Sequence, residues 1–151
     1  MNKVKCPSGE FEAIYKDESY KFLGIPYATY KDRWDESRLL SKEINFQAFK
    51  YGSSSPQTRF DDDNNSGYSF FLDNSLESES EDCLTLNICT KSFDSSFPVM
   101  IWIHGGALVS GGSSSMMYEL EHLAKKNIVL VSINYRLGPL GFLKLDEVTN
   151  G

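Results

Sequence analysis

Two nearly continuous apolar runs dominate the second half of the chain, at residues 98–103 and 128–133. A run that is apolar on both faces is typical of strands in a parallel sheet with layers above and below it, so we predict two buried strands that anchor the core. The stretch between them, at residues 116–127, favours a helix. Strand, helix and strand in this order predict a βαβ unit over about residues 98–134, whose strands run parallel.

The first half of the chain has shorter signals. Residues 11–15 and 20–25 are rich in aromatic and β-branched side chains, and Pro26 closes the second segment, so both are predicted strands of an antiparallel start. Residues 83–89 alternate between apolar and polar types, which predicts a half-buried strand with its apolar residues on one face. Together these signals predict the α/β class, with a mixed central sheet.

Composition places the chain among soluble globular proteins. Of its 151 residues, 40% are hydrophobic and 24% are charged, and a chain of this length can bury a core without metal or disulfide crosslinks. The net charge of −6 argues against binding to nucleic acid or to anionic lipid. No apolar stretch is long enough for a membrane span. We expect no nucleic-acid partner and no membrane, and no motif indicates a cofactor or a metal.

An acidic stretch covers residues 61–82. It carries eight Asp and Glu residues and no Lys or Arg, mixed with Ser, Asn and Gly, which predicts a solvated loop between ordered segments. A calcium site is the more specific alternative, but the adjacent carboxylates at 61–63 lack the spacing and the glycine of an EF-hand loop.

Cysteine usage and the N-terminus bear on the compartment. Cys6, Cys83 and Cys89 form an odd count without a Cys-x-x-Cys pair or a zinc spacing. The N-terminus has a short basic start but not the apolar stretch of a secretory signal. We expect a reduced, cytoplasmic protein whose cysteines are unpaired.

Candidate chemistry lies directly after the first apolar run, where ligands gather in α/β sheets. The loop begins His104-Gly105-Gly106-Ala107, and glycines there let the backbone turn sharply and present N–H groups outward. One use is phosphate binding, but the Gly-x-x-x-x-Gly spacing of residues 106–111 is followed by Gly-Ser instead of Lys-Ser/Thr. Another use is an oxyanion hole, in which N–H donors stabilise the charge on a carbonyl oxygen during acyl transfer. A tight turn without chemistry stays a third interpretation.

Four blocks along the chain share their order and spacing with one family. The blocks are residues 22–28, 81–88, 98–106 and 133–138, the last followed by 141–143. In these blocks the chain resembles the type-B carboxylesterase and cholinesterase family, and the resemblance covers nearly its whole length. It implies part of an α/β-hydrolase fold and the hydrolysis of carboxylic esters through a Ser, Glu/Asp and His triad. It also implies that Gly106 and Ala107 supply the oxyanion N–H groups, with Gly105 allowing the turn.

The same resemblance implies structural roles for charged residues. Arg33 and Glu81 stand at positions that the family joins by an ion pair. Arg136 should also find an acidic partner, which in the family lies beyond residue 151. His104 should be a structural hydrogen-bonding residue of the loop rather than an acid or a base.

One departure from the family concerns a disulfide. The family pairs the cysteine at position 83 with one just before Pro-Gln, where this chain has Ser55. Cys83 should therefore be a free thiol, which agrees with a reduced compartment.

The triad has no counterpart among the 151 residues. No Gly-x-Ser-x-Gly nucleophile motif is present, and residues 111–115, which come nearest, end in serine. Both histidines precede the point where the nucleophile should appear. We therefore expect residues 1–151 to be the N-terminal part of a single carboxylesterase domain, inactive alone, with a small carboxylic ester and the missing C-terminal part as its partners. A non-catalytic binding or adhesion relative and a fragment without function are the alternatives.

Overall fold

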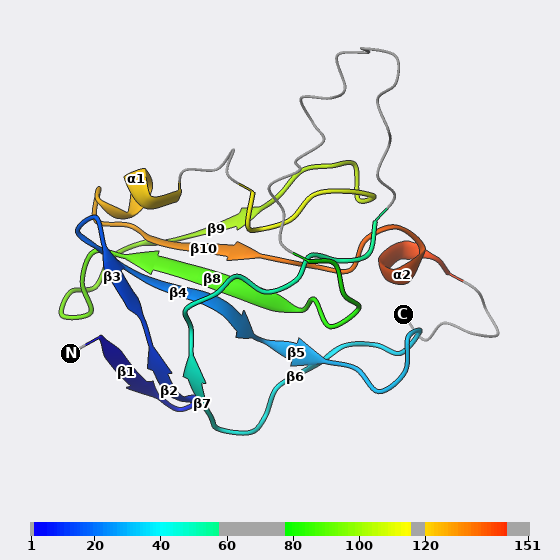
Figure 1. The fold of residues 1–151 in the computed structure, drawn as a ribbon, viewed down its shortest axis with the longest axis horizontal. Coiled ribbons are helices and arrows are strands. Elements are labelled where there is room, and N and C mark those ends of the chain that lie inside the picture. Colours follow the sequence, from blue (N-terminus) through cyan, green and yellow to red (C-terminus); the bar gives the residue numbers. More distant parts are fainter. Residues whose placement is uncertain (1, 58–77, 116–119, 145–151) are drawn as a thin grey trace, which may run out of the picture.

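A five-stranded sheet forms the centre of the molecule (Figure 1). The computed structural model describes residues 2–57, 78–115 and 120–144. In order across the sheet, the strands are β3 (Ile14–Lys16), β4 (Ser19–Pro26), β8 (Thr85–Thr90), β10 (Val129–Ile133) and β9 (Val99–Ile103). β10 runs parallel to β9, whereas the other neighbouring strands are antiparallel. The predicted mixed sheet is therefore confirmed.

Two smaller sheets accompany the central one. A three-stranded sheet contains β1 (Lys3–Cys6), β2 (Gly9–Glu12) and β7 (Ile44–Gln47), and a two-stranded sheet contains β5 (Ala28–Thr29) and β6 (Arg38–Leu39). The single strand predicted at residues 11–15 is wrong, because β2 and β3 belong to different sheets. Ala13 lies between them and is buried, so the chain passes from one sheet to the other at this residue.

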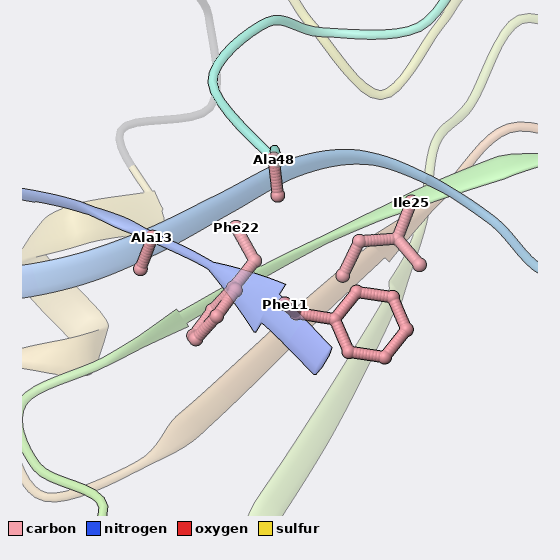
Figure 2. Packing of buried hydrophobic residues seen from close by; sticks show 5 residues of the cluster. All are labelled: Phe11, Ala13, Phe22, Ile25 and Ala48. Carbon is pink, nitrogen blue, oxygen red and sulfur yellow. The ribbon is translucent and has the colours of Figure 1, made fainter. Parts of the chain in front are cut away.

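The main hydrophobic cluster lies where the three-stranded sheet meets the central sheet. Its buried members come chiefly from β2 and β4, and half-buried residues of β1, β7 and β8 pack around them. Burying a Phe or Ile side chain contributes about 1.5–3 kcal/mol, so this cluster holds the small sheet against the first strands of the large one. Figure 2 shows its five buried residues: Phe11, Ala13, Phe22, Ile25 and Ala48.

The opposite face of the central sheet carries helix α1 (Leu120–Ala124). Ala124 packs against Leu130 of β10 and Cys89 of β8, all buried. The order β9, α1 and β10 confirms the predicted βαβ unit, although the helix is shorter than predicted and residues 116–119 lie outside the described ranges. A second short helix, α2 (Gly138–Phe142), follows β10. Neither helix of the described ranges has the length that crossing a bilayer requires.

Strand β9 departs from the burial that its sequence predicts. Val99, Ile101 and Ile103 are 62–63% exposed, so the prediction that this strand is buried on both faces is wrong. The reason is its position, because β9 is the edge of the sheet and nothing among the described residues covers this face. The same run of residues therefore forms an exposed apolar stripe, which we call the β9 stripe.

Strand β8 buries its polar face more deeply than its apolar face. Asn87 is only 4% exposed, while the apolar residues of the other face are half-buried. Its side-chain oxygen accepts the N–H of Gly24 at 2.9 Å, and its nitrogen donates to the hydroxyls of Ser113 (2.9 Å) and Ser132 (3.1 Å). These bonds satisfy the carboxamide, which allows an Asn to replace an apolar side chain there.

Most of the acidic stretch predicted as a solvated loop, residues 61–77, lies outside the described residues. Its C-terminal end is tied to the chain before it. The Ser54 N–H donates to the Ser78 carbonyl and the Ser80 N–H donates to the Ser54 carbonyl, both at 3.0 Å. These bonds hold the C-terminal end of the stretch to the segment that precedes the stretch.

Candidate active-site loop

The loop after β9 turns back on itself through left-handed backbone. Gly106 (φ 117°), Ala107 (φ 52°) and Leu108 (φ 64°) follow one another with positive φ. The Gly106 carbonyl accepts the N–H groups of Val109 and Ser110, both at 3.0 Å, which closes the turn. Each non-glycine residue in this region costs about 1–2 kcal/mol, so contacts with the rest of the molecule must hold the loop in place.

Two backbone N–H groups of this loop have no acceptor among the described residues. The Gly105 carbonyl faces the buried His104 ring, and the Gly106 carbonyl faces the interior of the turn. In a trans peptide the N–H lies opposite the preceding carbonyl, so the N–H groups of Gly106 and Ala107 point the other way. Both residues are exposed, and no oxygen in the described part of the chain accepts a hydrogen bond from either group. This donor pair is therefore open to an oxygen of a ligand.

The need for glycine falls on Gly106 rather than on Gly105. A Cβ at Gly106 would lie 1.9 Å from the Ser110 carbonyl oxygen, whereas a Cβ at Gly105 would meet no atom within 4 Å. Gly105 also lacks a positive φ. The expectation that Gly105 allows the turn is therefore corrected to Gly106, because the loop closes on the carbonyl of that residue.

The buried His104 side chain holds the loop through a hydrogen bond and a ring contact. His104 is 3% exposed, its ring stacks on Tyr135 with 4.5 Å between ring centroids, and its carbonyl accepts the Tyr135 hydroxyl at 2.8 Å. The ring Nδ1 donates to the Gly105 carbonyl at 2.8 Å. Burial lowers the pKa of His104 below its ordinary value of 6.5, since desolvation disfavours the charged ring. A neutral ring in this place orients the Gly105–Gly106 peptide.

The far end of the loop is held by two side-chain amides. Gln57 Oε1 accepts the Gly111 N–H at 2.7 Å, and Gln57 Nε2 donates to the Gly111 carbonyl at 3.0 Å. Asn134 Oδ1 accepts the N–H of Ser113 at 2.7 Å. Two polar residues that lie far from the loop in the sequence therefore fix its last residues.

Sequence reasoning missed Gln57, Asn134 and Tyr135. All three lie in segments that the resemblance to the family covers. Gln57 stands two residues after Ser55, which replaces the family's cysteine, and Asn134 and Tyr135 lie within the matched block 133–138. Their contacts with the loop depend on tertiary structure, which neither spacing nor composition reveals.

Arg33, Glu81 and Arg136 form a second group. Arg33 Nε and Nη2 donate to the Glu81 carboxylate at 3.0 and 2.5 Å, and this bonding holds the pKa of Glu81 below its ordinary range. Arg136 Nη1 donates to the carbonyls of Arg33 (3.1 Å) and Asp35 (3.0 Å), and its guanidinium lies 5.1 Å from the centroid of the Tyr30 ring. Within the described residues no carboxylate pairs with Arg136.

No disulfide joins Cys6, Cys83 or Cys89, and Cys83 has Ser55 as its neighbour. Cys83 is fully buried, its thiol is in hydrogen-bonding contact with the Ser55 side chain, and burial raises the pKa of the thiol. The Ser55 hydroxyl also accepts the Leu137 N–H at 3.0 Å. The described part of the chain offers no cluster of three His, Cys, Asp or Glu side chains that could hold a metal ion.

Comparison with known proteins identifies the family. Residues 2–151 match the Carboxylesterase family. The chain is 38% identical over 143 residues to phenmedipham hydrolase of Pseudarthrobacter oxydans, and 34% identical over 151 residues to para-nitrobenzyl esterase of Bacillus subtilis. These matches cover 90% and 95% of this chain, but only 28% and 29% of the two relatives.

Solved structures agree with the sequence matches. A thermophilic PNB esterase superposes with a TM-score of 0.79 at 32% identity, covering 98% of this chain and 31% of that one. Another PNB esterase structure gives a TM-score of 0.80 at the same identity. The expected α/β-hydrolase fold is thereby confirmed for this portion. The chain, which spans less than a third of these relatives, belongs to the carboxylesterase family.

Proposed function

We propose that this chain supplies the oxyanion-binding loop of a carboxylic ester hydrolase. The observation that carries the proposal is the donor pair, the N–H groups of the exposed residues Gly106 and Ala107, which donate to no acceptor in the described residues. When a nucleophile attacks an ester carbonyl, negative charge develops on the carbonyl oxygen. Two preorganised N–H donors about 2.7–3.1 Å from that oxygen lower the barrier to this step.

The backbone geometry of the loop supports the proposal. Ala107 and Leu108 adopt positive φ although neither is glycine, which costs free energy that a plain turn would avoid. Such strain is often stored at functional sites, where it fixes groups in advance of the reaction. Here it is sustained by His104 below the loop and by the side-chain amides at its end.

The nucleophile, acid and base of the reaction are assigned to another part of the same domain. The 151 residues contain no Gly-x-Ser-x-Gly motif, and the chain spans only 28–29% of the esterase and hydrolase that it matches. The β9 stripe supports this assignment, because such apolar surface on an edge strand is normally covered by further structure. Alone, the chain should therefore not turn over esters.

We also infer a reducing compartment, such as the cytoplasm, because none of the three cysteines is disulfide-bonded. Ser55 occupies the position next to Cys83 where a second cysteine would form a disulfide, and the buried Cys89 is not disulfide-bonded either. Mass spectrometry of the protein isolated from its own cells without reduction should find three alkylated thiols. A crosslink between any two of the cysteines would contradict the inference.

The experiment that tests the proposed function restores a complete domain. In this hybrid esterase, residues 2–151 replace the matching portion of the Bacillus subtilis para-nitrobenzyl esterase, to which they are 34% identical. We expect the hybrid to hydrolyse a para-nitrophenyl ester and to be labelled by a fluorophosphonate that reacts with active-site serines. The 151-residue chain alone should do neither.

Two controls make the outcome interpretable. The unmodified Bacillus esterase gives the reference rate, and a thermal melt of the hybrid shows whether it folds cooperatively. A folded hybrid without turnover and without labelling would contradict the proposal and would favour a non-catalytic relative. Turnover by the isolated chain would contradict the assignment of the triad to another part.

A further inference from the structure

Gln57 grips the end of the candidate loop with both atoms of its carboxamide. Its Oε1 accepts the Gly111 N–H at 2.7 Å and its Nε2 donates to the Gly111 carbonyl at 3.0 Å. The side chain thus pairs with a single backbone residue in the way that a neighbouring strand would. Such two-point pairing fixes both the position and the orientation of Gly111.

Gln57 is itself held in place by its surroundings. Its Nε2 also donates to the Ser55 carbonyl at 3.1 Å, and its backbone N–H donates to the Glu79 carboxylate at 3.3 Å. Ser54, three residues before Gln57, forms backbone hydrogen bonds with Ser78 and Ser80. The grip on Gly111 therefore comes from a fixed support, not from a free side chain.

Gly111 lies against the bond that orients the donor pair. With φ at 109°, a Cβ at Gly111 would be 2.5 Å from His104 Nδ1 and 2.6 Å from the Gly105 carbonyl oxygen. These two atoms form the hydrogen bond that turns the Gly105 carbonyl inward and the Gly106 N–H outward. A shift of Gly111 towards these two atoms would therefore disturb that bond, because one added carbon on Gly111 would already overlap both of them.

We propose that Gln57 is a positioning residue for the donor pair, acting through Gly111, His104 and Gly105. The proposal rests on the proposed function for its catalytic meaning, since it assigns Gln57 no contact with substrate. The contacts that link Gln57 to the donor pair do not depend on the proposed function. These contacts predict that a substitution at Gln57 changes the position of the Gly106 N–H, although the two residues are far apart in the sequence.

The first test needs no catalysis. We would prepare the 151-residue chain with ¹⁵N-labelled glycine and alanine and record amide spectra for Gln57→Glu and Gln57→Met. Glu keeps the acceptor for the Gly111 N–H but loses the donor, whereas Met loses both. The matched controls are Gln47→Glu and Gln47→Met, because Gln47 is an exposed residue of β7 in the three-stranded sheet.

The expected result is a graded response of the donor pair. The amide signals of Gly106 and Ala107 should shift or split in both Gln57 variants, more in Met than in Glu, and should stay in place in both Gln47 variants. Signals of Gly106 and Ala107 that stay in place while Gly111 moves would overturn the proposal. Loss of cooperative unfolding in both Gln57 variants would also overturn it, in favour of a role in folding alone.

The second test uses the hybrid esterase and separates this proposal from the proposed function. Gln57→Met should lower kcat about tenfold to a hundredfold with little change in KM, since small misplacement of catalytic groups has effects of this size. Gln57→Glu should recover part of the rate. An unchanged kcat would overturn the positioning role, whereas a hybrid inactive without any substitution would count against the proposed function and leave the spectra to decide on Gln57.

Discussion

At the residue scale, Gly106 is the glycine that the loop cannot replace, whereas Gly105 is replaceable. Gly106→Ala should destabilise the 151-residue chain by about 1–3 kcal/mol, because a Cβ would collide with the Ser110 carbonyl and φ is 117°. Gly105→Ala should change the free energy of unfolding by no more than about 0.5 kcal/mol, as at a surface site without special geometry. Urea unfolding measures both. Equal effects of the two substitutions would contradict the assignment.

His104 gives the loop a pH dependence whose sign follows from its burial. Its pKa is lowered in the folded protein, so between 6.5 and the folded value the unfolded chain binds more protons. Stability from this residue is present above pH 6.5 and is lost as the pH falls towards the folded pKa. The free energy of unfolding should therefore drop more steeply between pH 7 and pH 5 in the natural chain than in His104→Gln. Parallel pH profiles would contradict a buried, neutral His104.

The sequence predicted the loop residues better than it predicted their supports. The motif His104-Gly105-Gly106-Ala107 carries its own local signal, since adjacent glycines after an apolar strand indicate a backbone turn. Which of the two glycines must adopt a positive φ depends on the hydrogen bonds that close the loop. These run from Val109 and Ser110 to the Gly106 carbonyl, and one sequence does not reveal them. The part played by Gln57 depends on a contact between distant segments, which has no signature in one sequence.

At the scale of elements, Ser55 and Cys83 join the chain before the acidic stretch to the residues that lead into β8. Ser55→Cys should form a disulfide with Cys83 under oxidised glutathione, because the two side chains are already in contact. Closing this loop should stabilise the chain by about 3 kcal/mol, reduced by the loss of the bond from the Leu137 N–H to the Ser55 hydroxyl. Thiol titration and thermal melts with and without reductant measure the effect. Four titratable thiols after oxidation would show that the geometry is wrong.

The two faces of strand β9 differ in burial, and substitutions on the two faces should therefore have different effects. Ile101→Lys lies in the β9 stripe and should reduce self-association of the 151-residue chain without loss of stability, since the side chain is 62% exposed. Met100→Lys is the matched control on the other face, where Met100 packs against the cluster under α1, and it should cost about 2 kcal/mol or more. Sedimentation and urea unfolding separate the two effects. A stability loss in Ile101→Lys equal to that in Met100→Lys would contradict the exposed stripe.

Sequence patterns identified the central strands but not their surroundings. The apolar runs predicted β9, β10 and the βαβ unit, because hydrophobic continuity marks strands of this class. Burial of β9 could not be predicted, since it depends on the neighbours beyond the edge of the sheet. The deep burial of Asn87 was equally hidden, because a polar residue enters a core only where several partners satisfy it.

At the scale of the whole molecule, the chain matches one portion of a larger architecture, that of its relatives. It reproduces under a third of the relatives' length, with a hydrophobic cluster of its own at the N-terminal strands and an exposed apolar stripe at β9. The loop that we assign to oxyanion binding follows this edge strand directly. In our account, the remaining structure covers the stripe and brings the nucleophile to the donor pair.

The most direct test of the central claim is the rate of ester hydrolysis by the hybrid esterase with and without Gly106→Ala. We expect turnover by the hybrid and a fall in kcat of about a hundredfold to a thousandfold on substitution. The clash of the new Cβ with the Ser110 carbonyl would displace the donor N–H groups, and losing an oxyanion donor has an effect of this size. Melting curves recorded beside the assay confirm that both proteins are folded. A folded Gly106→Ala hybrid that hydrolyses the ester at the unsubstituted rate would contradict the claim that this loop binds the oxyanion.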